Sequence, residues 1–174
     1  MLARLDDVHG FAVRTRDELA LADGLILPGG ESTAQARLLR DFGLLDALAQ
    51  QIRAGLPVWG TCAGLILLAG DIVGEQPHLG LMAVTVRRNA YGRQLDSFRR
   101  QICLPAVSAQ PVDLVFIRAP WIEQVQAPAE ILATVDGHIV AARQGWMLGT
   151  SFHPELTGDP AFHRYFAGMV RASC

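Results

Sequence analysis

Cys62 stands where a cysteine side chain could act as a nucleophile. It is the central residue of Gly-Thr-Cys-Ala-Gly at positions 60–64, and apolar runs precede and follow this segment. This is the spacing of a nucleophile elbow, in which a strand turns sharply into a helix and lifts the reactive side chain out of the sheet. Glycines on either side permit the turn, and the N-terminus of the following helix favours a thiolate. The segment therefore predicts a cysteine nucleophile for acyl transfer.

A base for this nucleophile is predicted within Ser-Phe-His-Pro-Glu at positions 151–155. Pro154 biases His153 towards an extended conformation, and residues i and i+2 of an extended segment point to the same side. Glu155 can therefore hold one imidazole nitrogen and leave the other free, which fixes the tautomer. Cys62, His153 and Glu155 then form a nucleophile, a general base and an orienting carboxylate.

Two backbone amides are the expected oxyanion hole. The apolar run at residues 24–27 ends in Pro28-Gly29-Gly30, and a glycine turn after a strand can present a bare N–H group. We predict that the N–H of Gly30 and the N–H of Ala63, directly after the nucleophile, bind the tetrahedral oxygen. Loss of one such donor typically lowers the rate about 10²–10³-fold.

Strands and helices that must position these residues alternate in the first half of the chain. The predicted strands are residues 11–15, 24–27, a strand ending at Val58, 81–86, 114–118, 131–135, 139–142 and 147–151. The predicted helices are residues 17–22, a helix that begins with a capping box of Ser32 and Gln35, 46–54, 63–72 and 159–171. Asp136-Gly137 is predicted to be a hairpin turn.

This order of elements predicts an α/β fold of three layers. A mostly parallel, flavodoxin-like sheet should carry helices on both faces, and the strand-rich second half should add an antiparallel portion. The length of 174 residues and a hydrophobic content of 51% suit a single domain over residues 1–174.

Composition excludes several classes of site. The formal net charge is −2 with both signs scattered, so neither nucleic-acid binding nor a membrane-surface helix is indicated. All 15 basic residues are arginine, so no lysine is available for a Schiff base, a Ser–Lys dyad or a phosphate loop. No His, Cys or Asp spacing suggests a metal site, and no cofactor is expected.

The cysteines favour a reducing compartment. Cys62, Cys103 and Cys174 are an odd number at unrelated spacings, which argues against a disulfide framework. We interpret Cys103 and Cys174 as structural or incidental. The first residues carry acids and no apolar signal segment, and no apolar run is long enough to span a membrane. We therefore expect a cytoplasmic protein.

Five segments of the chain resemble one family of enzymes. They are Pro-Gly-Gly-Glu-Ser-Thr at 28–33, Gly-Thr-Cys-Ala-Gly at 60–64, Arg-Asn-Ala-Tyr-Gly-Arg-Gln at 88–94, Phe-Ile-Arg-Ala-Pro at 116–120 and Ser-Phe-His-Pro-Glu-Leu-Thr at 151–157. Together they are similar to class I, or triad, glutamine amidotransferases. More closely, they resemble the glutaminase subunits of pyridoxal 5′-phosphate synthase, the PdxT/SNO family, which the segments at 88–94 and 116–120 separate from other triad glutaminases.

The resemblance implies hydrolysis of L-glutamine to L-glutamate and ammonia through a thioester on Cys62, with His153 moving the protons. The positions that line the glutamine site in this family match Gly29, Gly30, Glu31, Ser32, Arg88, Ile117 and Arg118. An arginine suits the substrate carboxylate, and the sequence leaves open which of the two arginines binds it. The implied partner is a synthase subunit of the PdxS/SNZ type, a lyase that receives the ammonia in a large heteromeric complex and makes pyridoxal phosphate (vitamin B6).

The resemblance also predicts a short N-terminus. Family members begin with a strand, a Leu-Gln-Gly-type loop and a helix before the region that matches Phe11. Residues 1–9 look like the end of that helix, so we expect the usual first strand to be missing from the sheet. Its absence would expose backbone polar groups and apolar surface.

Other functions stay open at this point. The chain could be the glutaminase of another pathway, such as histidine or nucleotide synthesis, although the segments at 88–94 and 116–120 argue against that. It could be a shortened, non-catalytic protein that docks on the synthase. The polar residues 87–100 fit either a solvated, charged segment or a loop that docks on a partner. A cysteine peptidase is more distant, because no peptide groove is indicated. For the glutaminase we expect weak activity that rises with the synthase, since an exposed loop near the site invites gating.

Overall fold

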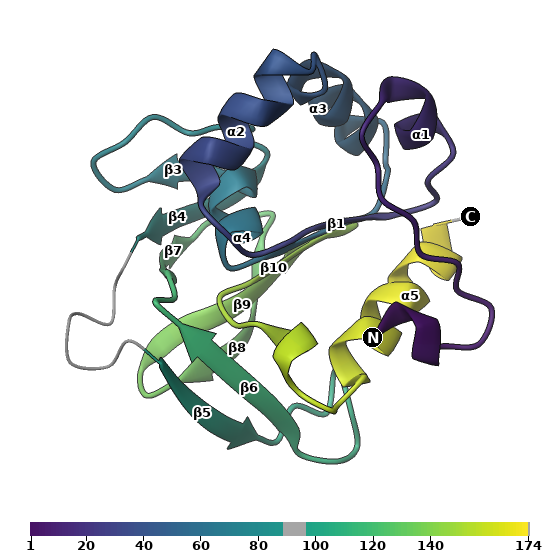
Figure 1. The fold of residues 1–174 in the computed structure, drawn as a ribbon. Helices are drawn as coiled ribbons and strands as arrows, with labels where there is room; N and C mark the ends of the chain where they lie inside the picture. Colours follow the sequence, from purple (N-terminus) through teal and green to yellow (C-terminus); the bar gives the residue numbers. More distant parts are fainter. Residues whose placement is uncertain (89–96, 174) are drawn as a thin grey trace.

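The fold is organised around one twisted sheet (Figure 1). The computed structural model describes residues 1–88 and 97–173. The sheet order is β1-β2-β10-β9-β7-β4-β3, with β8 paired to β9 and a separate ribbon of β5 and β6. The strands are β1 (Leu25–Leu27), β2 (Val58–Thr61), β3 (Ala69–Ile72), β4 (Met82–Arg87), β5 (Ser97–Ile102), β6 (Val112–Ile117), β7 (Trp121–Val125), β8 (Glu130–Val135), β9 (His138–Gln144) and β10 (Met147–Thr150). The helices are α1 (Arg16–Ala20), α2 (Ser32–Asp41), α3 (Leu45–Arg53), α4 (Ala63–Leu68) and α5 (Ala161–Ser173), with short 3₁₀ helices η1 (Leu2–Arg4) and η2 (Pro154–Leu156).

Parallel pairing brings two distant segments to one edge of the sheet. Strand β2 lies between β1 and β10 and runs parallel to both, with Thr61 opposite Thr150. The chain therefore leaves β2 and β10 at the same end, which is where α/β sheets place their sites. Beyond β10 the sheet continues antiparallel through β9, β7 and β4. The predicted α/β fold with an added antiparallel portion is confirmed.

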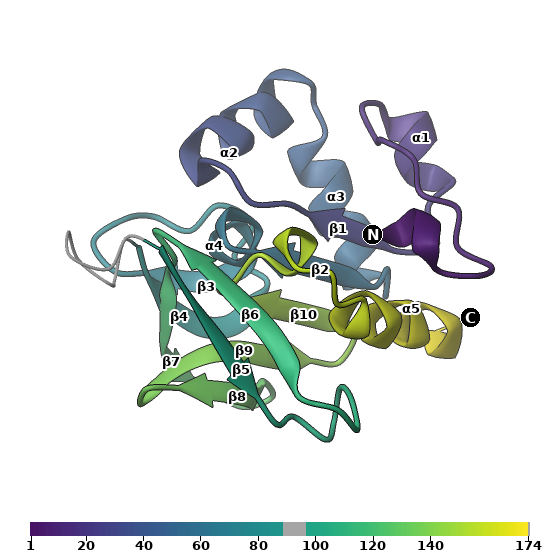
Figure 2. The same cartoon turned by 60° about the horizontal axis from the view of Figure 1, so that its bottom comes forward.

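The two faces of the sheet carry separate apolar cores. Val58 and Trp59 are neighbours on β2 and point to opposite faces, as the two-residue period of a strand requires. The core around Val58 includes residues of α2, α3 and α4, and the core around Trp59 includes residues of α5 and β6. Helices therefore lie on both faces, as the sequence predicts (Figure 2).

Some predicted elements are wrong, and pairing explains the differences. Residues 11–15 form no strand, because an extended segment needs a neighbouring strand to satisfy its backbone. The helix predicted for residues 63–72 ends at Leu68, and Ala69–Ile72 pair with β4 instead. Gly70 disfavours helix here. The sequence does not predict strands β5 and β7, because their polar and charged residues hide the alternation. The other predicted elements lie within a few residues of their predicted ends.

The hairpin predicted at Asp136-Gly137 is confirmed. Val135 of β8 pairs with His138 of β9, so the loop has two residues. Both loop residues have positive φ, 50° at Asp136 and 81° at Gly137. Two positive φ angles are what a type I′ turn requires, and this turn matches the twist of the flanking strands.

Helix α2 begins where predicted but with a different cap. The N-cap residue is Glu31, whose carboxylate accepts hydrogen bonds from Thr33 N at 3.1 Å and Ala34 N at 2.7 Å. The predicted capping box of Ser32 and Gln35 is wrong, because Ser32 is already helical. The Gln35 amide instead donates to the carbonyl of Gly29 at 3.0 Å and braces the preceding loop.

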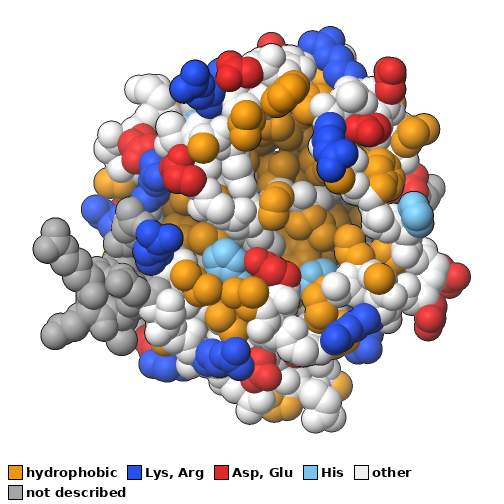
Figure 3. Space-filling view, in the orientation of Figure 1, with side chains coloured by type: hydrophobic (Ala, Val, Ile, Leu, Met, Phe, Trp, Pro, Cys, Tyr) orange, Lys and Arg blue, Asp and Glu red, His pale blue; other side chains and the backbone are white. Residues whose placement is uncertain are grey.

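Strand β1 borders an apolar hollow. It stands at one end of the strand order and pairs only with β2 among the described residues. The hollow beside it has a volume of about 650 Å³, and Figure 3 shows hydrophobic side chains gathered in it. Its walls include Leu19, Leu25, Leu39, Leu48 and Phe166, and it extends to Pro28 at the start of the Gly29-Gly30 loop. In the described part of the chain, no helix combines the length and apolar character that crossing a bilayer would need.

Candidate active site

The backbone at Cys62 makes a sharp, strained turn between β2 and α4. Cys62 has φ 49° and ψ −102°, a conformation that a residue with a side chain rarely adopts. Its N–H donates to Thr150 O on the neighbouring strand at 2.8 Å. A Cβ on Gly60 would lie 2.4 Å from the Gly64 carbonyl, and one on Gly64 would lie 2.0 Å from Leu27 O. Both glycines are therefore required for this turn to pack.

His153 follows β10 closely and lies beside a carboxylate. Its Nδ1 is 2.7 Å from Glu155 Oε1, and its backbone N–H donates to Val115 O at 2.7 Å. The imidazole packs against the loop after β1, because a Cβ on Gly29 would lie 2.4 Å from His153 Cε1. Glu155 reaches the ring from the 3₁₀ helix η2, and not from the extended segment that the sequence suggests.

The protonation state of His153 depends on the Cys62 side chain and on Glu155. The Cys62 side chain, and then the hydrogen bond with Glu155, raise the pKa of His153 to about 10, although partial burial opposes the increase. Burial also opposes ionisation of Glu155, but the hydrogen bond from His153 lowers the pKa of that carboxyl below its ordinary value. Imidazolium is therefore the stable form of His153 near neutral pH.

The loop after β1 touches both halves of this arrangement. Gly29 contacts His153, and the carbonyl of Leu27 contacts Gly64 in the elbow. Gly30 has φ 137°, in the region that favours glycine. Ala63 is the first residue of α4, so its N–H is one of the helix amides that have no partner within the helix. These are the two amides predicted to form an oxyanion hole.

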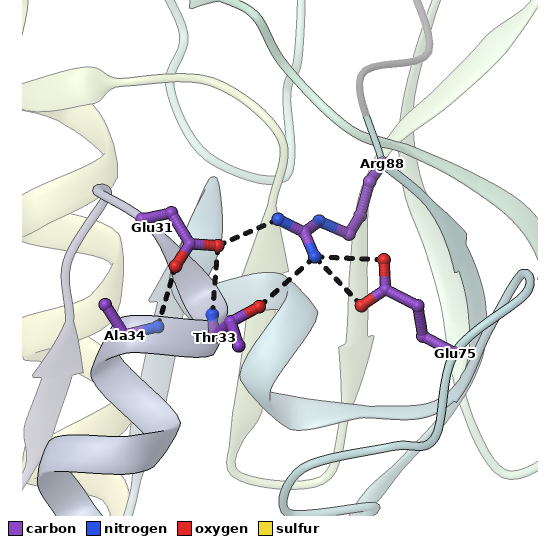
Figure 4. A network of polar contacts seen from close by, with 5 residues as sticks. All are labelled: Glu31, Thr33, Ala34, Glu75 and Arg88. Atoms are coloured by element: carbon purple, nitrogen blue, oxygen red, sulfur yellow. Dashed lines mark hydrogen bonds and ion pairs between the residues drawn. The ribbon is translucent and has the colours of Figure 1, made fainter.

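The residues predicted to bind substrate fall into two groups. Glu31 and Arg88 contact each other, with Arg88 Nη2 2.8 Å from Glu31 Oε1 (Figure 4). Ser32, next to Glu31, is buried, and its Oγ has no hydrogen-bond partner among the described residues. Ile117 is the last residue of β6, the strand whose Val115 O accepts a hydrogen bond from His153 N, and Arg118 follows the strand with φ 43°. Within the described residues, neither of these two joins the contacts of Arg88.

Two residues at the site carry no sequence signal. Glu75 forms an ion pair with Arg88 at 2.8 Å from the turn between β3 and β4. Thr150 accepts hydrogen bonds from the Cys62 backbone and from Trp59 Nε1, the latter at 3.0 Å. Both contacts depend on the register of strands that are far apart in the sequence, so no local motif marks them.

The described residues contain no metal-ligand group and one free cysteine besides Cys62, which is Cys103. No group of three or more His, Cys, Asp or Glu side chains in residues 1–88 and 97–173 could hold a metal ion. Cys103 is free and exposed. Cys174 and residues 89–94, which include most of one motif and the centre of the expected docking loop, lie outside the described residues.

Comparison with known proteins gives consistent matches over most of the chain. The SNO glutamine amidotransferase family matches residues 5–172. The pyridoxal 5′-phosphate synthase subunit PdxT of Ruminiclostridium cellulolyticum is 51% identical over 170 residues, covering 97% of this chain and 90% of that protein. The protein of the same name from Streptomyces coelicolor is 55% identical over 164 residues, covering 92% of this chain and 81% of that protein.

Solved structures have the same fold. The crystal structure of a glutamine amidotransferase superimposes with a TM-score of 0.86 at 42% sequence identity, covering 91% of this chain and 85% of that one. A glutamine amidotransferase from Thermotoga maritima shares the fold more distantly, with a TM-score of 0.50 at 14% identity, covering 85% of this chain and 62% of that one.

Proposed function

This chain belongs to the SNO glutamine amidotransferase family, and from that premise we propose that it is the ammonia-supplying glutaminase of a pyridoxal 5′-phosphate synthase. It hydrolyses L-glutamine to L-glutamate and ammonia. The ammonia passes to a synthase of the PdxS type, which builds the pyridoxal ring. Since the chain has no lysine, any imine chemistry in this pathway takes place on that partner.

The chemistry uses Cys62, His153 and Glu155. The Cys62 thiolate attacks the side-chain amide carbon of glutamine, and the N–H groups of Gly30 and Ala63 bind the oxygen of the tetrahedral intermediate. When the C–N bond breaks, the His153 imidazolium gives its proton to the leaving nitrogen, so ammonia departs and a γ-glutamyl thioester remains. Neutral His153 then takes a proton from water, which attacks the thioester and releases glutamate and Cys62.

One observation supports this mechanism most strongly. The imidazole of His153 interacts with the Cys62 side chain and with Glu155 Oε1 at 2.7 Å, and together they raise its pKa to about 10. A resting imidazolium supplies the proton that the leaving amine needs, and its charge stabilises the thiolate that attacks.

For substrate binding we assign the α-carboxylate of glutamine to Arg88 and leave Arg118 on the wall of the site. Arg88 is tied to Glu31, which lies two residues from Gly29, and Gly29 touches the His153 ring. These contacts connect the Arg88 guanidinium to the loop that touches His153. Guanidinium binds carboxylate through paired, charge-assisted hydrogen bonds.

Trapping with a glutamine-analogue electrophile tests the proposal directly. The full chain, alone and with its synthase partner, is incubated with the electrophile and digested for mass spectrometry. Modification of Cys62 that glutamine suppresses is the expected result, together with ammonia release that rises when the synthase is present. Modification of Cys103 alone, or none in either mixture, would contradict a glutaminase.

The non-catalytic alternative has one observation in its favour. The side chain of Glu155 is 43% exposed, and an exposed carboxylate orients an imidazole less firmly than a buried one. A chain that binds the synthase but is never modified at Cys62, with or without that partner, would fit this alternative.

A further inference from the structure

The guanidinium of Arg88 is held by two segments that are distant from it and from each other in the sequence, the start of α2 and the turn after β3 (Figure 4). Arg88 Nη2 donates to Glu31 Oε1 at 2.8 Å, at the N-cap of α2. Arg88 Nη1 lies 2.9 and 2.8 Å from the two Glu75 oxygens and 3.3 Å from Thr33 Oγ1. Arg88 is the first residue after β4, so these contacts fix a side chain at the end of a strand.

These contacts leave part of the guanidinium available to a ligand. A guanidinium has five N–H donors, two on each Nη and one on Nε. Nη1 is occupied by Glu75 and Thr33, whereas Nη2 has one acceptor and Nε has none among residues 1–88 and 97–173. The remaining Nε and Nη2 hydrogens can form the paired contact that a carboxylate accepts.

The two glutamates are not equivalent. Both carboxylate oxygens of Glu31 also accept backbone N–H groups of α2, so its position is set by the helix. Glu75 has no hydrogen-bond partner for its side chain other than Arg88 in the described part of the chain. The hydrogen-bonding capacity of the Glu75 carboxylate is therefore directed at Arg88.

The turn that carries Glu75 is well fixed. Gly74 has φ 80°, and Glu75 N donates to Ile72 O at 3.1 Å, which closes the turn. Val73 N donates to Val86 O on β4 at 3.0 Å. The turn is thus anchored to the strand that ends just before Arg88, so Glu75 and Arg88 share one rigid support.

We propose that Glu75 is a positioning residue that orients Arg88 for the α-carboxylate of glutamine. This inference rests on the proposed glutaminase function and on the role assigned to Arg88 within it. An arginine side chain that moves freely in the empty site loses rotamer entropy when it binds substrate. Glu75 reduces this cost, because it holds Arg88 Nη1 in place before glutamine binds. Glu75 contacts neither substrate nor the reacting atoms, so its effect should fall on binding and spare the chemical step.

Glu75→Gln is the decisive variant, because it keeps the shape of the side chain and removes its charge. We expect KM for glutamine to rise about fivefold, with kcat changed less than about twofold, as for an exposed but well-aligned ion pair. Glu75→Asp, which retains the charge, should recover part of the loss. Glu123→Gln is the matched control, since Glu123 pairs with Arg87, the residue next to Arg88, and forms no ion pair with a site residue in the described part of the chain.

A double-mutant cycle separates positioning from a general structural effect. In an Arg88→Lys background, Glu75→Gln should change KM much less than in the wild type, because the group that it orients is gone. An equal change in both backgrounds, a loss confined to kcat, or a KM at or below the wild-type value would overturn the inference. If the wild-type chain with its synthase releases no ammonia from glutamine, the proposed function itself fails, so the two failures are distinguishable.

Discussion

The elbow at Cys62 and the ion-pair network at Arg88 position functional side chains in opposite ways. Every residue of α4 is buried, Cys62 is 7% exposed, and the turn is set by backbone contacts of Gly60 and Gly64. At Arg88 the side chains are partly exposed, 26% for Arg88, 40% for Glu75 and 55% for Glu31, and side-chain contacts join them. The reacting atom is therefore fixed by the fold, whereas the substrate-binding group is held by exposed charges that can be altered without unfolding the protein.

The largest effect should come from the reacting atom itself. Cys62→Ser should reduce glutamine hydrolysis at least about 10³-fold, because a serine hydroxyl is a much weaker nucleophile than cysteine sulfur. Arg88→Lys should instead raise KM about tenfold and change kcat less, since lysine cannot form the paired contact. Ammonia release measured over a range of glutamine concentrations gives both constants.

The Cys62 variant should still bind the synthase with the affinity of the wild type, measured by titration calorimetry, because Cys62 is buried. Ammonia release that survives in Cys62→Ser would remove the nucleophile assignment. A kcat defect in Arg88→Lys as deep as that of Cys62→Ser would erase the distinction between the two regions.

A backbone clash at the elbow should be the next largest effect. Gly64→Ala places a methyl group where Leu27 O would be 2.0 Å away, and a backbone atom cannot move aside cheaply. We expect the free energy of unfolding in urea to fall by roughly 3 kcal/mol or more.

Gly168→Ala is the matched control for that substitution. Gly168 lies in α5, and a Cβ there meets no atom within 4 Å. The same change of residue should therefore be neutral or stabilise by about 0.4–1 kcal/mol, because alanine restricts the unfolded chain. Equal stability of the two alanine variants would show that the elbow is not tightly packed.

The difference between the two regions also explains what the sequence can predict. The elbow is a local pattern, with Gly60, Cys62 and Gly64 inside five residues, and its geometry follows from the types of those residues. Glu75 lies in a turn after β3, and the sequence pattern predicts a helix end in place of β3. The contact of Glu75 with Arg88 exists only because β3 pairs with β4. Residues that are brought together by strand pairing, such as Glu75 and Arg88, have no local sequence motif that marks their contact.

The cap of α2 shows the same limit at shorter range. Ser32 and Gln35 have the spacing of a capping box, yet Glu31 supplies the cap and Gln35 braces the loop before it. Spacing therefore locates the helix start, but not the side chain that caps it. Only the resemblance of residues 28–33 to a family marks Glu31 as a substrate-site residue.

Titration of His153 tests the link between sulfur and imidazole. Nuclear magnetic resonance of labelled histidine side chains should give a pKa of about 10 in the wild type. Cys62→Ala should lower the pKa of His153 most, because the Cys62 side chain is its largest cause, and Glu155→Gln should lower it less. A His153 that titrates near its ordinary value of about 6.5 in the wild type would contradict the resting imidazolium.

The smallest effect concerns Glu31, which belongs to the exposed network and also caps a helix. Backbone hydrogen bonds from Ala34 and then Thr33 lower the pKa of the Glu31 carboxyl. A lowered pKa means that the ionised cap stabilises the fold above the unfolded-state pKa of about 4.5, and that this contribution is lost as pH falls through the lower, folded-state value. Glu31→Gln should therefore cost less than about 1 kcal/mol in urea unfolding at pH 7, as for an exposed cap. The difference from wild type should shrink below about pH 4.5. If the difference in free energy of unfolding between Glu31→Gln and wild type stays constant down to about pH 3, the shape of Glu31, and not its charge, makes it the cap. The exposed network would then depend on packing, as the elbow does.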